Sequence, residues 1–371
     1  MSIEKDKLLI PTEYSYGYLR CPPKLEDDVF VVALHDRTPR GRLNESGAIY
    51  LAANGIPVAT VRPAATLSQP QLAKAGDVTA SAAIEFRYSD VKRILQEHGA
   101  WKEPGIIRLE CVDPARSRVA ETALFALPVG MGDPVPSDDN IIRVAGKQPG
   151  FDFRVSGACW YTMINDVVAA ETGAALKKDA RILDWGVGCA RIARYFIETG
   201  FTNLSGIDID QYNVDWCLAN LPGADFRRCD FDPPTEYEDA SFDLIYGHSV
   251  LTHLTSQSEA EWLAELDRLL APTGLACLTF ISDVGMYLNH NVKLKPEPSL
   301  YAELWHTGRI DFGAMRVGVD KDRPGYYRVV AHSHDYVLRE WSKVFDIVRI
   351  IPGFANNQDA VLLRKKGLAS E

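Results

Sequence analysis

Residues 181–196 read RILDWGVGCARIARYF and decide the fold of the second half of the chain. The stretch opens with the apolar residues Ile182 and Leu183 and then turns through Gly186 and Gly188, which allow unusual backbone dihedrals. Apolar residues with helical spacing follow directly, and arginines stand between them (Ile192, Ala193, Phe196 and Ile197; Arg191 and Arg194). This order predicts a buried strand, a tight turn and a helix N-terminus, with free backbone N–H groups in front of a ligand.

The residues that flank the two glycines separate two classes of ligand. A dinucleotide-binding turn has the pattern G-x-G-x-x-G, with a third glycine where the helix meets the strand. Here Arg191 stands three residues after Gly188, and Asp184 stands two residues before Gly186. The resulting pattern, D-x-G-x-G-x-x-R, resembles the first motif of the class I methyltransferases that depend on S-adenosylmethionine. Ala190 departs from that pattern, since many members of the family carry a third glycine there.

Four later segments continue the resemblance in the order in which the family carries them: GIDID (206–210), CDFDPP (229–234), FDLIYGHSVLTHL (242–254) and LLAPTGLACLTF (269–280). Strands and helices alternate through this half of the chain, which predicts parallel pairing through right-handed crossovers. We expect the strands Arg181–Trp185, Asn203–Ile209, Asp225–Arg228, Phe242–Gly247, Gly274–Phe280, Val344–Pro352 and Gln358–Arg364. We expect the helices Ala190–Glu198, Asn213–Ala219 and Glu259–Leu270, with a short one after Ser249.

The predicted fold class is α/β, a Rossmann-like seven-stranded methyltransferase sheet preceded by a smaller β-rich N-terminal domain. The last two strands flank Gly353 and Asn356–Asn357, which predicts that they close the sheet as an antiparallel hairpin.

The resemblance implies S-adenosylmethionine as the cofactor, with contacts at the ends of successive strands. The implied contacts are Asp184, Gly186, Gly188, Asp208, Ile209, Asp230, Phe231, Gly247 and Tyr161. A carboxylate at the second strand end accepts the ribose hydroxyls, and Asp208 is favoured for this over Asp210, whose alternative role is to cap the next helix. An acid at the third strand end receives the adenine amino group and the following residue packs on the ring, which fits Asp230 and Phe231, although Asp232 can exchange roles with Asp230.

Two further positions are assigned from the same comparison. Gly247 would let the backbone approach the sulfonium side of the cofactor. The leading helix, roughly Ala158–Glu171, would cover the methionine end and makes Tyr161 and Trp160 candidate contacts. Aromatic residues at helical spacing are more often plain core, and that alternative stays open.

Residues 1–140 have a different sequence pattern, in which short apolar runs alternate with turn residues. This pattern predicts a β-rich accessory domain for recognition or dimerisation. The expected strands are Val29–Leu34, Ile56–Val61, Ile106–Cys111 and Ala120–Leu127, with turns at Pro39–Gly41, Asn54–Gly55 and Asp113–Pro114. One helix, Ser89–His98, is expected to be capped by Ser89 or Asp90. Proline and glycine predict a linker at 141–155, which leaves 156–371 for the methyltransferase domain.

His248 and His253 are the candidate catalytic residues, because an oxygen nucleophile needs a base with a pKa near neutrality. His248 follows the fourth strand directly and is the stronger candidate, whereas His253 is the more easily explained by a structural role. Residues 283–333 interrupt the alternation and predict a substrate lid rich in aromatic residues and histidine (Tyr287, His290, Tyr301, Trp305, His306, Tyr326, Tyr327 and His332). His332 and His334 are alternatively caps for a helix at Asp335–Val344. No histidine spacing supports a metal site, so none is predicted.

The composition limits the number of domains, the class of partner and the cellular compartment that we expect. With 371 residues and 46% apolar residues, the chain is expected to hold two or three globular domains. A net charge of −10 argues against a general nucleic-acid binder. Seven cysteines without regular spacing predict reduced thiols, and residues 1–14 show neither a signal peptide nor a membrane span. The default is therefore a cytoplasmic enzyme with no membrane partner.

The predicted function is transfer of a methyl group from S-adenosylmethionine to a small molecule, with a hydroxyl of a sugar or natural product as the first choice. The N-terminal domain is expected to serve recognition or homo-oligomerisation. The alternatives are a protein or nitrogen acceptor, a non-catalytic module that binds the cofactor, and, less favoured because Arg191 replaces the third glycine, a nicotinamide oxidoreductase.

Overall fold

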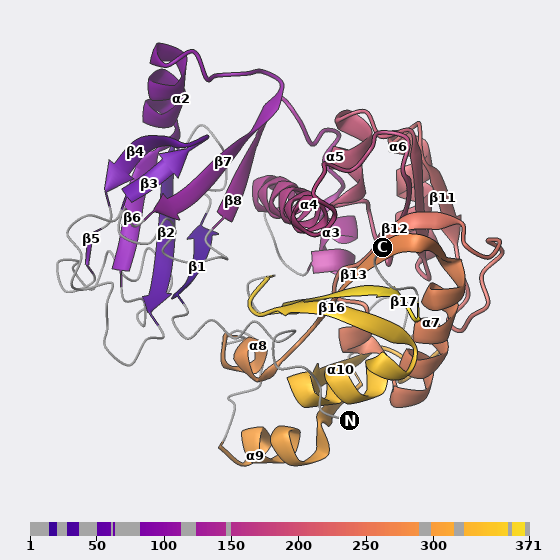
Figure 1. Cartoon of the computed structure of the whole chain (residues 1–371). Coiled ribbons are helices and arrows are strands. Elements are labelled where there is room, and N and C mark those ends of the chain that lie inside the picture. The colour runs from indigo at the N-terminus through magenta and orange to yellow at the C-terminus, as the bar shows by residue number, and fades with distance from the viewer. Residues whose placement is uncertain are drawn as a thin grey trace. The chain divides into compact units, whose positions relative to one another are not determined.

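The computed structural model describes residues 15–20, 28–36, 50–60, 62–63, 82–112, 124–145, 150–288, 298–314, 323–354 and 358–367. The predicted turns at Pro39–Gly41 and Asp113–Pro114, His290 and Asn356–Asn357 lie outside these residues. The described residues form two compact units that divide between residues 163 and 164. The boundary lies within the long helix α4 (Gly150–Thr172; Figure 1).

The N-terminal unit is β-rich, as predicted. One antiparallel sheet has the order β1-β2-β6-β5 (Ser15–Arg20, Val29–Asp36, Ala82–Arg87 and Arg62–Pro63). The other has the order β4-β3-β7-β8 (Ile56–Thr60, Tyr50–Ala53, Gly105–Val112 and Leu124–Val129). Both sheets contribute to one apolar core, which includes Phe30, Ile84, Leu51, Leu109 and Phe125.

Helix α2 (Tyr88–Glu97) follows β6 directly, and its cap differs from the prediction. Neither Ser89 nor Asp90 caps it. Instead Asp28 accepts hydrogen bonds from the Ser89 backbone N–H and hydroxyl, both at 2.7 Å. Asp28 lies 61 residues before Ser89 in the sequence, directly before β2, so a search for a local capping residue misses it.

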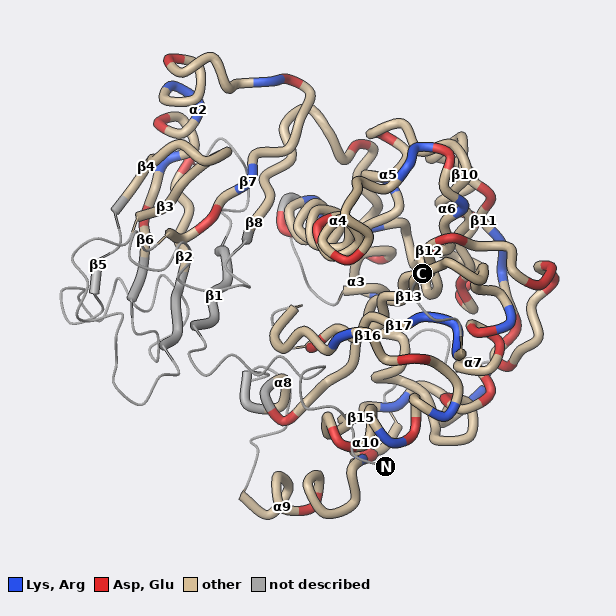
Figure 2. The backbone as a smooth tube through the Cα atoms, viewed as in Figure 1, with Lys and Arg blue, Asp and Glu red and all other residues tan. Residues whose placement is uncertain are grey.

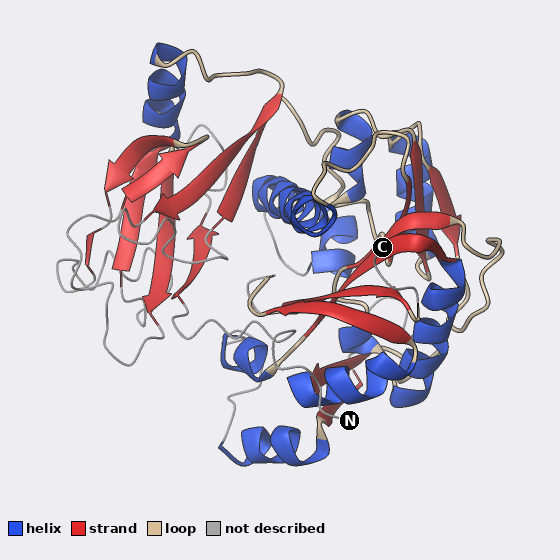
Figure 3. Cartoon of the chain, viewed as in Figure 1, coloured by secondary structure: helices blue, strands red, loops and turns tan. Residues whose placement is uncertain are grey.

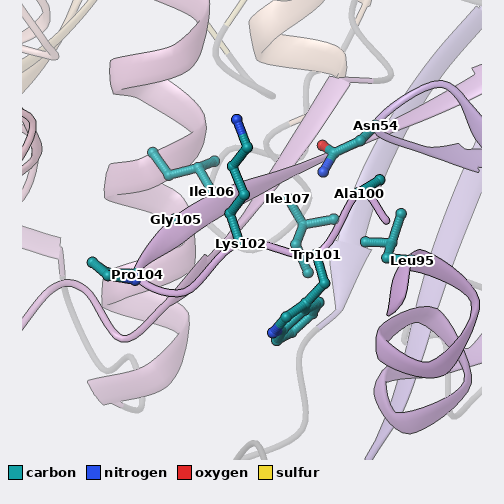
Figure 4. Close-up of a pocket in the computed structure, with 9 residues that line it drawn as sticks. All are labelled: Asn54, Leu95, Ala100, Trp101, Lys102, Pro104, Gly105, Ile106 and Ile107. Atoms are coloured by element: carbon teal, nitrogen blue, oxygen red, sulfur yellow. The ribbon is translucent and has the colours of Figure 1, made fainter. Parts of the chain in front are cut away.

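A pocket of about 410 Å³ lies in the N-terminal unit beside the end of α2 and the start of β7. Its walls are mainly apolar, and Figure 4 shows the Trp101 indole on one side and the Asn54 amide on the other. The Lys102 ammonium projects away from the indole (Figure 4). The other lining residues are Leu95, Ala100, Pro104, Gly105, Ile106 and Ile107.

The segment predicted as a linker is partly helical. Helix α3 (Asp138–Ala145) ends within it and α4 begins within it. Ile141 in α3 is 1% exposed, so burial of an apolar side chain orders a stretch whose proline and glycine content suggested a flexible connection.

The C-terminal unit is built on a seven-stranded sheet with helices on its faces (Figure 3), which confirms the predicted fold class. The order is β11-β10-β9-β12-β13-β17-β16. The strands are β9 (Arg181–Trp185), β10 (Asn203–Asp208), β11 (Asp225–Arg228), β12 (Phe242–Gly247), β13 (Leu270–Phe280), β16 (Phe345–Ile351) and β17 (Asp359–Lys365). The first five pair in parallel, and β16 and β17 pair antiparallel as predicted.

The principal helices of this unit are α5 (Ala193–Glu198), α6 (Gln211–Asn220), α7 (Ser256–Leu269) and α10 (His334–Glu340), with a 3₁₀ turn η5 (Leu251–His253). The inner faces of the central strands pack with α7 and α10 in one large core. Asp210 caps α6 and Thr255 caps α7 through side-chain oxygens, which fixes where these helices begin.

The segment predicted as a lid, 283–333, contains α8 (Asp283–Leu288), α9 (Pro298–Thr307) and the antiparallel pair β14 (Arg309–Ala314) and β15 (Arg328–His332). The predicted capping role of His332 and His334 is wrong, since the Ser333 hydroxyl caps α10 by accepting a hydrogen bond from the Tyr336 N–H at 3.1 Å. His334 instead contacts Asp359 at 2.5 Å. Among the described residues, no helix has the length and apolar character needed to cross a membrane.

Candidate active site

The strand order of the C-terminal sheet reverses between β9 and β12. In open α/β sheets, ligands bind outside the carboxyl ends of the strands at such a reversal. Asp184 lies one residue before the end of β9, Asp208 ends β10, and Gly247 ends β12. Asp230 follows β11 by two residues. The structure therefore brings these four predicted positions to one edge of the sheet, the edge formed by the carboxyl ends of the parallel strands.

The glycine turn after β9 does not offer its N–H groups to a ligand, and that part of the sequence prediction is wrong. The N–H groups of Gly186 and Val187 both donate to the Ile207 carbonyl, at 2.9 and 3.0 Å, and the Gly188 N–H donates to Asp208 Oδ2 at 2.8 Å. Helix α5 begins only at Ala193. The turn amides thus fasten the end of β9 to the end of β10.

Both turn glycines have left-handed φ values, 79° at Gly186 and 52° at Gly188. A Cβ at Gly186 would also lie 2.4 Å from Val250 Cγ2, so this position excludes any side chain. Ala190 has φ 56°, a conformation that costs a non-glycine residue about 1–2 kcal/mol. The departure from the family pattern noted at Ala190 therefore has a physical cost, because a glycine would adopt this conformation without strain.

Gly247 is needed for packing against its neighbours in the core. A Cβ there would lie 2.7 Å from Trp185 Cε3 and 3.2 Å from Leu278 Cδ2. This requirement explains the glycine without reference to a ligand, and the predicted approach to a sulfonium stays a prediction.

Asp208 and Asp210 have clearly different surroundings. Asp208 accepts one backbone hydrogen bond on each oxygen, from Gly188 and from the Asp210 N–H, both at 2.8 Å. Asp210 is the N-cap of α6 and accepts from the Tyr212 N–H at 3.2 Å. Burial raises the pKa of Asp208 to about 6 even though both hydrogen bonds lower it. A hydrogen bond from the Ile209 backbone also lowers this pKa. Because a carboxylate can accept about four hydrogen bonds, Asp208 can still accept one from a ligand hydroxyl.

Asp184 is 3% exposed, and the Tyr246 hydroxyl donates a hydrogen bond of 2.8 Å to its Oδ2. Burial raises the pKa of Asp184 to about 7, and the nearby Asp208 carboxylate raises it further, while Tyr246 and Arg191 lower it. Tyr246 and Asp184 are register partners on β12 and β9, so the pairing of the parallel strands creates this contact. Two carboxyl groups with raised pKa therefore lie at the reversal of the strand order.

Phe231 lies three residues after the end of β11 and is held by its backbone and ring. Its carbonyl accepts hydrogen bonds from Trp262 Nε1 at 2.9 Å and from the Tyr326 hydroxyl at 2.6 Å. The Tyr326 ring meets the Phe231 ring edge-on, with 4.7 Å between centroids. Asp230 is exposed, and Asp232 pairs with Arg323. The 283–333 segment is thus fastened to the end of β11.

His248 lies directly after β12, and Arg191 NH2 contacts its Nδ1 at 3.2 Å. Burial lowers the pKa of His248 well below its usual value, and the positive charge of Arg191 lowers it further. Burial likewise lowers the pKa of Arg191 from its usual value. Arg191, which stands in place of the third glycine of a dinucleotide-binding motif, therefore contacts His248, a predicted catalytic residue.

His253 ends η5, and its Nδ1 lies 2.6 Å from the carbonyl oxygen of Arg328, the first residue of β15. Its ring stacks on Tyr327 with 4.0 Å between centroids and 22° between planes. Burial lowers the pKa of His253 to about 4, although the carbonyl contact raises it. Tyr327 lies near Asp208 and Asp210, since burial and then the charges of these two carboxylates raise its pKa.

Buried Glu259 in α7 joins the inserted strands to the rest of the unit. Its Oε2 accepts from His332 Nε2 at 2.8 Å and from Arg309 Nε at 3.3 Å, and its Oε1 accepts from Trp341 Nε1 at 2.8 Å. Arg309 also donates to the carbonyl of Leu254, directly after η5, at 2.7 Å. These contacts hold β14 and β15 against the turn that carries His253.

Sequence reasoning missed Tyr246 and Glu259 as parts of this region, and it named Tyr327 only as a member of the predicted lid. Tyr246 was detectable, because it stands one residue before the end of its strand, as Asp184 does. Tyr161 lies in the N-terminal unit, and its assignment stays a prediction. Ile209 packs against the core beside Asp208. Within the described residues, no three His, Cys, Asp or Glu side chains are grouped to hold a metal ion.

Residues 183–278, which run from within β9 to within β13, match the family described as methyltransferase domain. The C-terminal part of the chain is a class I S-adenosylmethionine-dependent methyltransferase domain. The match spans the glycine turn and the four strand ends described above.

Solved structures with distant similarity include other methyltransferases. An S-adenosylmethionine-dependent methyltransferase from Mesorhizobium loti is 17% identical, with a TM-score of 0.37, and the match covers 51% of this chain and 94% of that one. The PH0226 protein from Pyrococcus horikoshii is 14% identical, with a TM-score of 0.43 and coverage of 61% and 96%. The glycopeptide N-methyltransferase MtfA in complex with S-adenosylmethionine is 13% identical, with a TM-score of 0.39 and coverage of 55% and 93%.

Proposed function

We propose that this chain transfers a methyl group from S-adenosylmethionine to a hydroxyl of a small molecule, such as a sugar or natural product. The observation that carries the proposal is the pair of buried carboxyl groups, Asp184 and Asp208, at the reversal of the strand order. Burial raises the pKa of both carboxyl groups, and a neighbouring carboxylate raises each further, Asp208 for Asp184 and Asp210 for Asp208. A ligand that brings an ammonium group and hydroxyls relieves this cost.

The residues present fit that cofactor. Asp208 has lone pairs for ribose hydroxyls, and Asp184 would attract the positively charged methionine end. Asp230 and Phe231 would receive the adenine, with the ring of Phe231 already supported by Tyr326. Gly186 and Gly188 carry no side chains, so at these two positions the turn presents only backbone atoms to a ligand.

When bound, S-adenosylmethionine supplies an activated methyl group on a sulfonium. The protein has then to orient the acceptor and exclude water, and orientation alone can lower a barrier by about 7–11 kcal/mol. Residues of the 283–333 segment contribute directly to the strand-end region, through Tyr326 on Phe231 and Tyr327 on His253. This arrangement supports a role for the segment in covering the acceptor.

The charge distribution supports a small acceptor over a nucleic acid. Segments of Lys and Arg lie among segments of Asp and Glu along the C-terminal unit (Figure 2), and the net charge of the chain is −10. A nucleic-acid surface is usually a continuous basic patch.

We further propose a recognition or dimerisation role for the N-terminal unit. The pocket beside Trp101 favours recognition, because it is apolar with the polar groups of Asn54 and Lys102 nearby, as small-molecule sites usually are. Light scattering of the full chain tests dimerisation. Loss of acceptor affinity in Trp101→Ala, with the affinity for S-adenosylhomocysteine unchanged, tests recognition. The expected location is the cytoplasm, which fractionation of the native host tests.

The experiment for the main proposal measures release of S-adenosylhomocysteine from S-adenosylmethionine by the full chain with pools of hydroxyl-bearing, amine-bearing and peptide acceptors. We expect turnover with the hydroxyl pool and a product that has gained the mass of one methylene group. Turnover only with amines or peptides would contradict the proposed hydroxyl acceptor and identify an amine or a peptide as the acceptor instead. Binding of S-adenosylhomocysteine without turnover in any pool would favour a non-catalytic module.

A further inference from the structure

Ser249 stands two residues after the end of β12 and has a left-handed backbone conformation, with φ 63°. Because serine carries a Cβ, this conformation is strained, and such strain persists only where the surrounding structure holds it. Strained residues also cluster at active sites and ligand-binding sites. Ser249 lies at the edge where the parallel strands end, so the contacts that hold it bear on the candidate site.

Three side chains hold both polar backbone groups of Ser249. Its N–H donates to Thr279 Oγ1 at 2.8 Å, and its carbonyl accepts from the Thr252 hydroxyl at 2.9 Å. The Gln358 amide accepts from the Thr279 hydroxyl at 2.6 Å and donates to the Ser249 hydroxyl oxygen at 2.7 Å. A contact of 3.1 Å between the Ser249 and Thr252 hydroxyls closes the network.

The hydroxyl protons of this network have defined positions. The Thr252 proton goes to the Ser249 carbonyl, so the Ser249 hydroxyl must donate to Thr252 Oγ1. The Thr279 hydroxyl has one proton, which goes to Gln358, so the amide turns its oxygen to Thr279 and its NH2 group to Ser249. Thr279 is 2% exposed and Gln358 is 6% exposed. Each donor in these contacts faces one acceptor, so the network favours a single conformation of the Ser249 backbone.

This network joins the antiparallel end of the sheet to the glycine turn. Thr279 lies one residue before the end of β13, and Gln358 directly precedes β17. Because β17 is antiparallel to β13, its first residues lie at the edge where the parallel strands end. The residue after Ser249, Val250, fills the space beside Gly186, where an added Cβ would lie 2.4 Å from Val250 Cγ2. The conformation of Ser249 therefore sets where Val250 packs against the glycine turn.

We propose that Thr279 and Gln358 are positioning residues of the methyltransferase site, because they hold Ser249 in its left-handed conformation. Ser249 in turn seats Val250 against the glycine turn. This role rests on the proposed function, since it concerns the edge that would hold the cofactor. When the network is broken, relief of the strain lets Ser249 adopt an ordinary backbone conformation, and Val250 leaves the glycine turn. Only the molecules that keep the turn in place then bind the cofactor, so the apparent Kd rises.

Isothermal titration of the full chain with S-adenosylhomocysteine tests this role in Thr279→Val and Thr279→Ser. Valine has the shape of threonine without the hydroxyl, whereas serine keeps the hydroxyl. We expect Thr279→Val to raise Kd about 5- to 30-fold, because one or two lost hydrogen bonds change an equilibrium by this factor. Thr279→Ser should restore the wild-type Kd. The matched control is Thr199→Val, which removes a hydroxyl bond to the Tyr195 carbonyl at the C-terminal end of α5 and should leave Kd unchanged. A wild-type Kd in Thr279→Val overturns the proposal, and so does an equal rise in Thr279→Ser.

A second substitution separates positioning from a general loss of stability. In the Thr279→Val background, Ser249→Gly should recover binding, because glycine adopts a left-handed φ without strain, whereas Ser249→Ala should not. Equal binding by these two double variants contradicts the role of the Ser249 conformation.

The ¹³C chemical shifts of Ser249 in the ligand-free chain report its backbone conformation and do not depend on the proposed function. We expect left-handed shifts in the wild type and their loss in Thr279→Val, and shifts that stay the same in this variant refute the proposal. Failure of the wild-type chain to bind S-adenosylhomocysteine, with the expected change in the shifts, refutes the proposed function instead.

Discussion

The backbone N–H of Gly188 donates a 2.8 Å hydrogen bond to Oδ2 of Asp208 and so ties the glycine turn to the end of the neighbouring strand. The other Asp208 oxygen accepts from the Asp210 N–H at the same distance. The carboxylate therefore shapes the turn and also keeps lone pairs for a ligand. Asparagine cannot replace Asp208, because its side-chain NH2 group is a donor. This group would face one of the two backbone N–H groups, which are also donors.

We predict that Asp208→Asn weakens binding of S-adenosylhomocysteine. One hydrogen bond to a charged acceptor contributes about 1.5–3 kcal/mol, which corresponds to roughly 10- to 150-fold in Kd. Asp210→Asn is the matched control, because asparagine is as good an N-cap as aspartate. Isothermal titration of both variants checks the assignment, and the reverse order of effects would transfer the ribose role to Asp210.

The raised pKa of Asp184, about 7, predicts a pH-dependent affinity for the cofactor. Below that pH the ligand-free carboxyl group is mostly protonated, and a bound ammonium group favours the carboxylate. Binding must then release a proton, so affinity falls as the pH drops below about 7 and levels off above it. Asp208, with a pKa of about 6, adds a second decrease at lower pH.

Tyr246→Phe isolates the contribution of Asp184. The Tyr246 hydroxyl lowers the pKa of Asp184, so its removal is expected to move the midpoint of the affinity curve to higher pH. Titrations on both sides of neutrality, in buffers with different ionisation enthalpies, measure the affinity and the proton release together. A midpoint that does not move in this variant would contradict the role of Asp184.

Arg194 is fully buried behind the glycine turn. Its Nε donates to the Ala190 carbonyl at 2.9 Å and its NH2 to the Cys189 carbonyl at 3.0 Å. Arg194→Met would remove both guanidinium donors and leave the Ala190 carbonyl with only the 3.4 Å bond from the backbone N–H of residue 194. Each lost hydrogen bond is expected to cost about 0.5–1.5 kcal/mol in the free energy of unfolding. Exposed Arg93→Met is the control and should stay within about 0.5 kcal/mol of wild type. Equal stability of the two variants in urea denaturation would refute the structural role of Arg194.

Glu259 accepts from three donors, so Glu259→Gln turns one of its oxygens into a donor that faces another donor. Breaking a buried charge network in this way costs about 3–5 kcal/mol of stability. The exposed Glu261→Gln on the same helix is the control. We expect faster hydrogen exchange in β14 and β15 for Glu259→Gln alone. Equal exchange in both variants would show that Glu259 does not anchor these strands.

The sequence predicted the sheet well because strand boundaries are local features. Asp225–Arg228 and Phe242–Gly247 agree to the residue, since each is bounded by turn residues or glycine. Helix α5 begins three residues later than predicted because the left-handed Ala190 extends the turn. Strand β13 begins four residues earlier than predicted, at Leu270, where its pairing with β12 is irregular.

The chemistry of the site depends on contacts that no local pattern encodes. His248 is set by Arg191, 57 residues away, and His253 by the Arg328 carbonyl, 75 residues away. Proximity to a strand end favoured His248 in the sequence, and the catalytic roles of both histidines stay predictions. The turn amides were expected to face a ligand, but their partners, Ile207 and Asp208, belong to the next strand.

The central claim is that one edge of the sheet, formed by Asp184, the glycine turn, Asp208 and Asp230, holds an adenosyl cofactor. A crystal structure of the full chain soaked with S-adenosylhomocysteine tests this most directly. We predict density at the ends of β9, β10, β11 and β12, with the ribose hydroxyls on Asp208 and the adenine beside Phe231. Saturating ligand that leaves this edge empty, or that binds elsewhere on the chain, would contradict the claim.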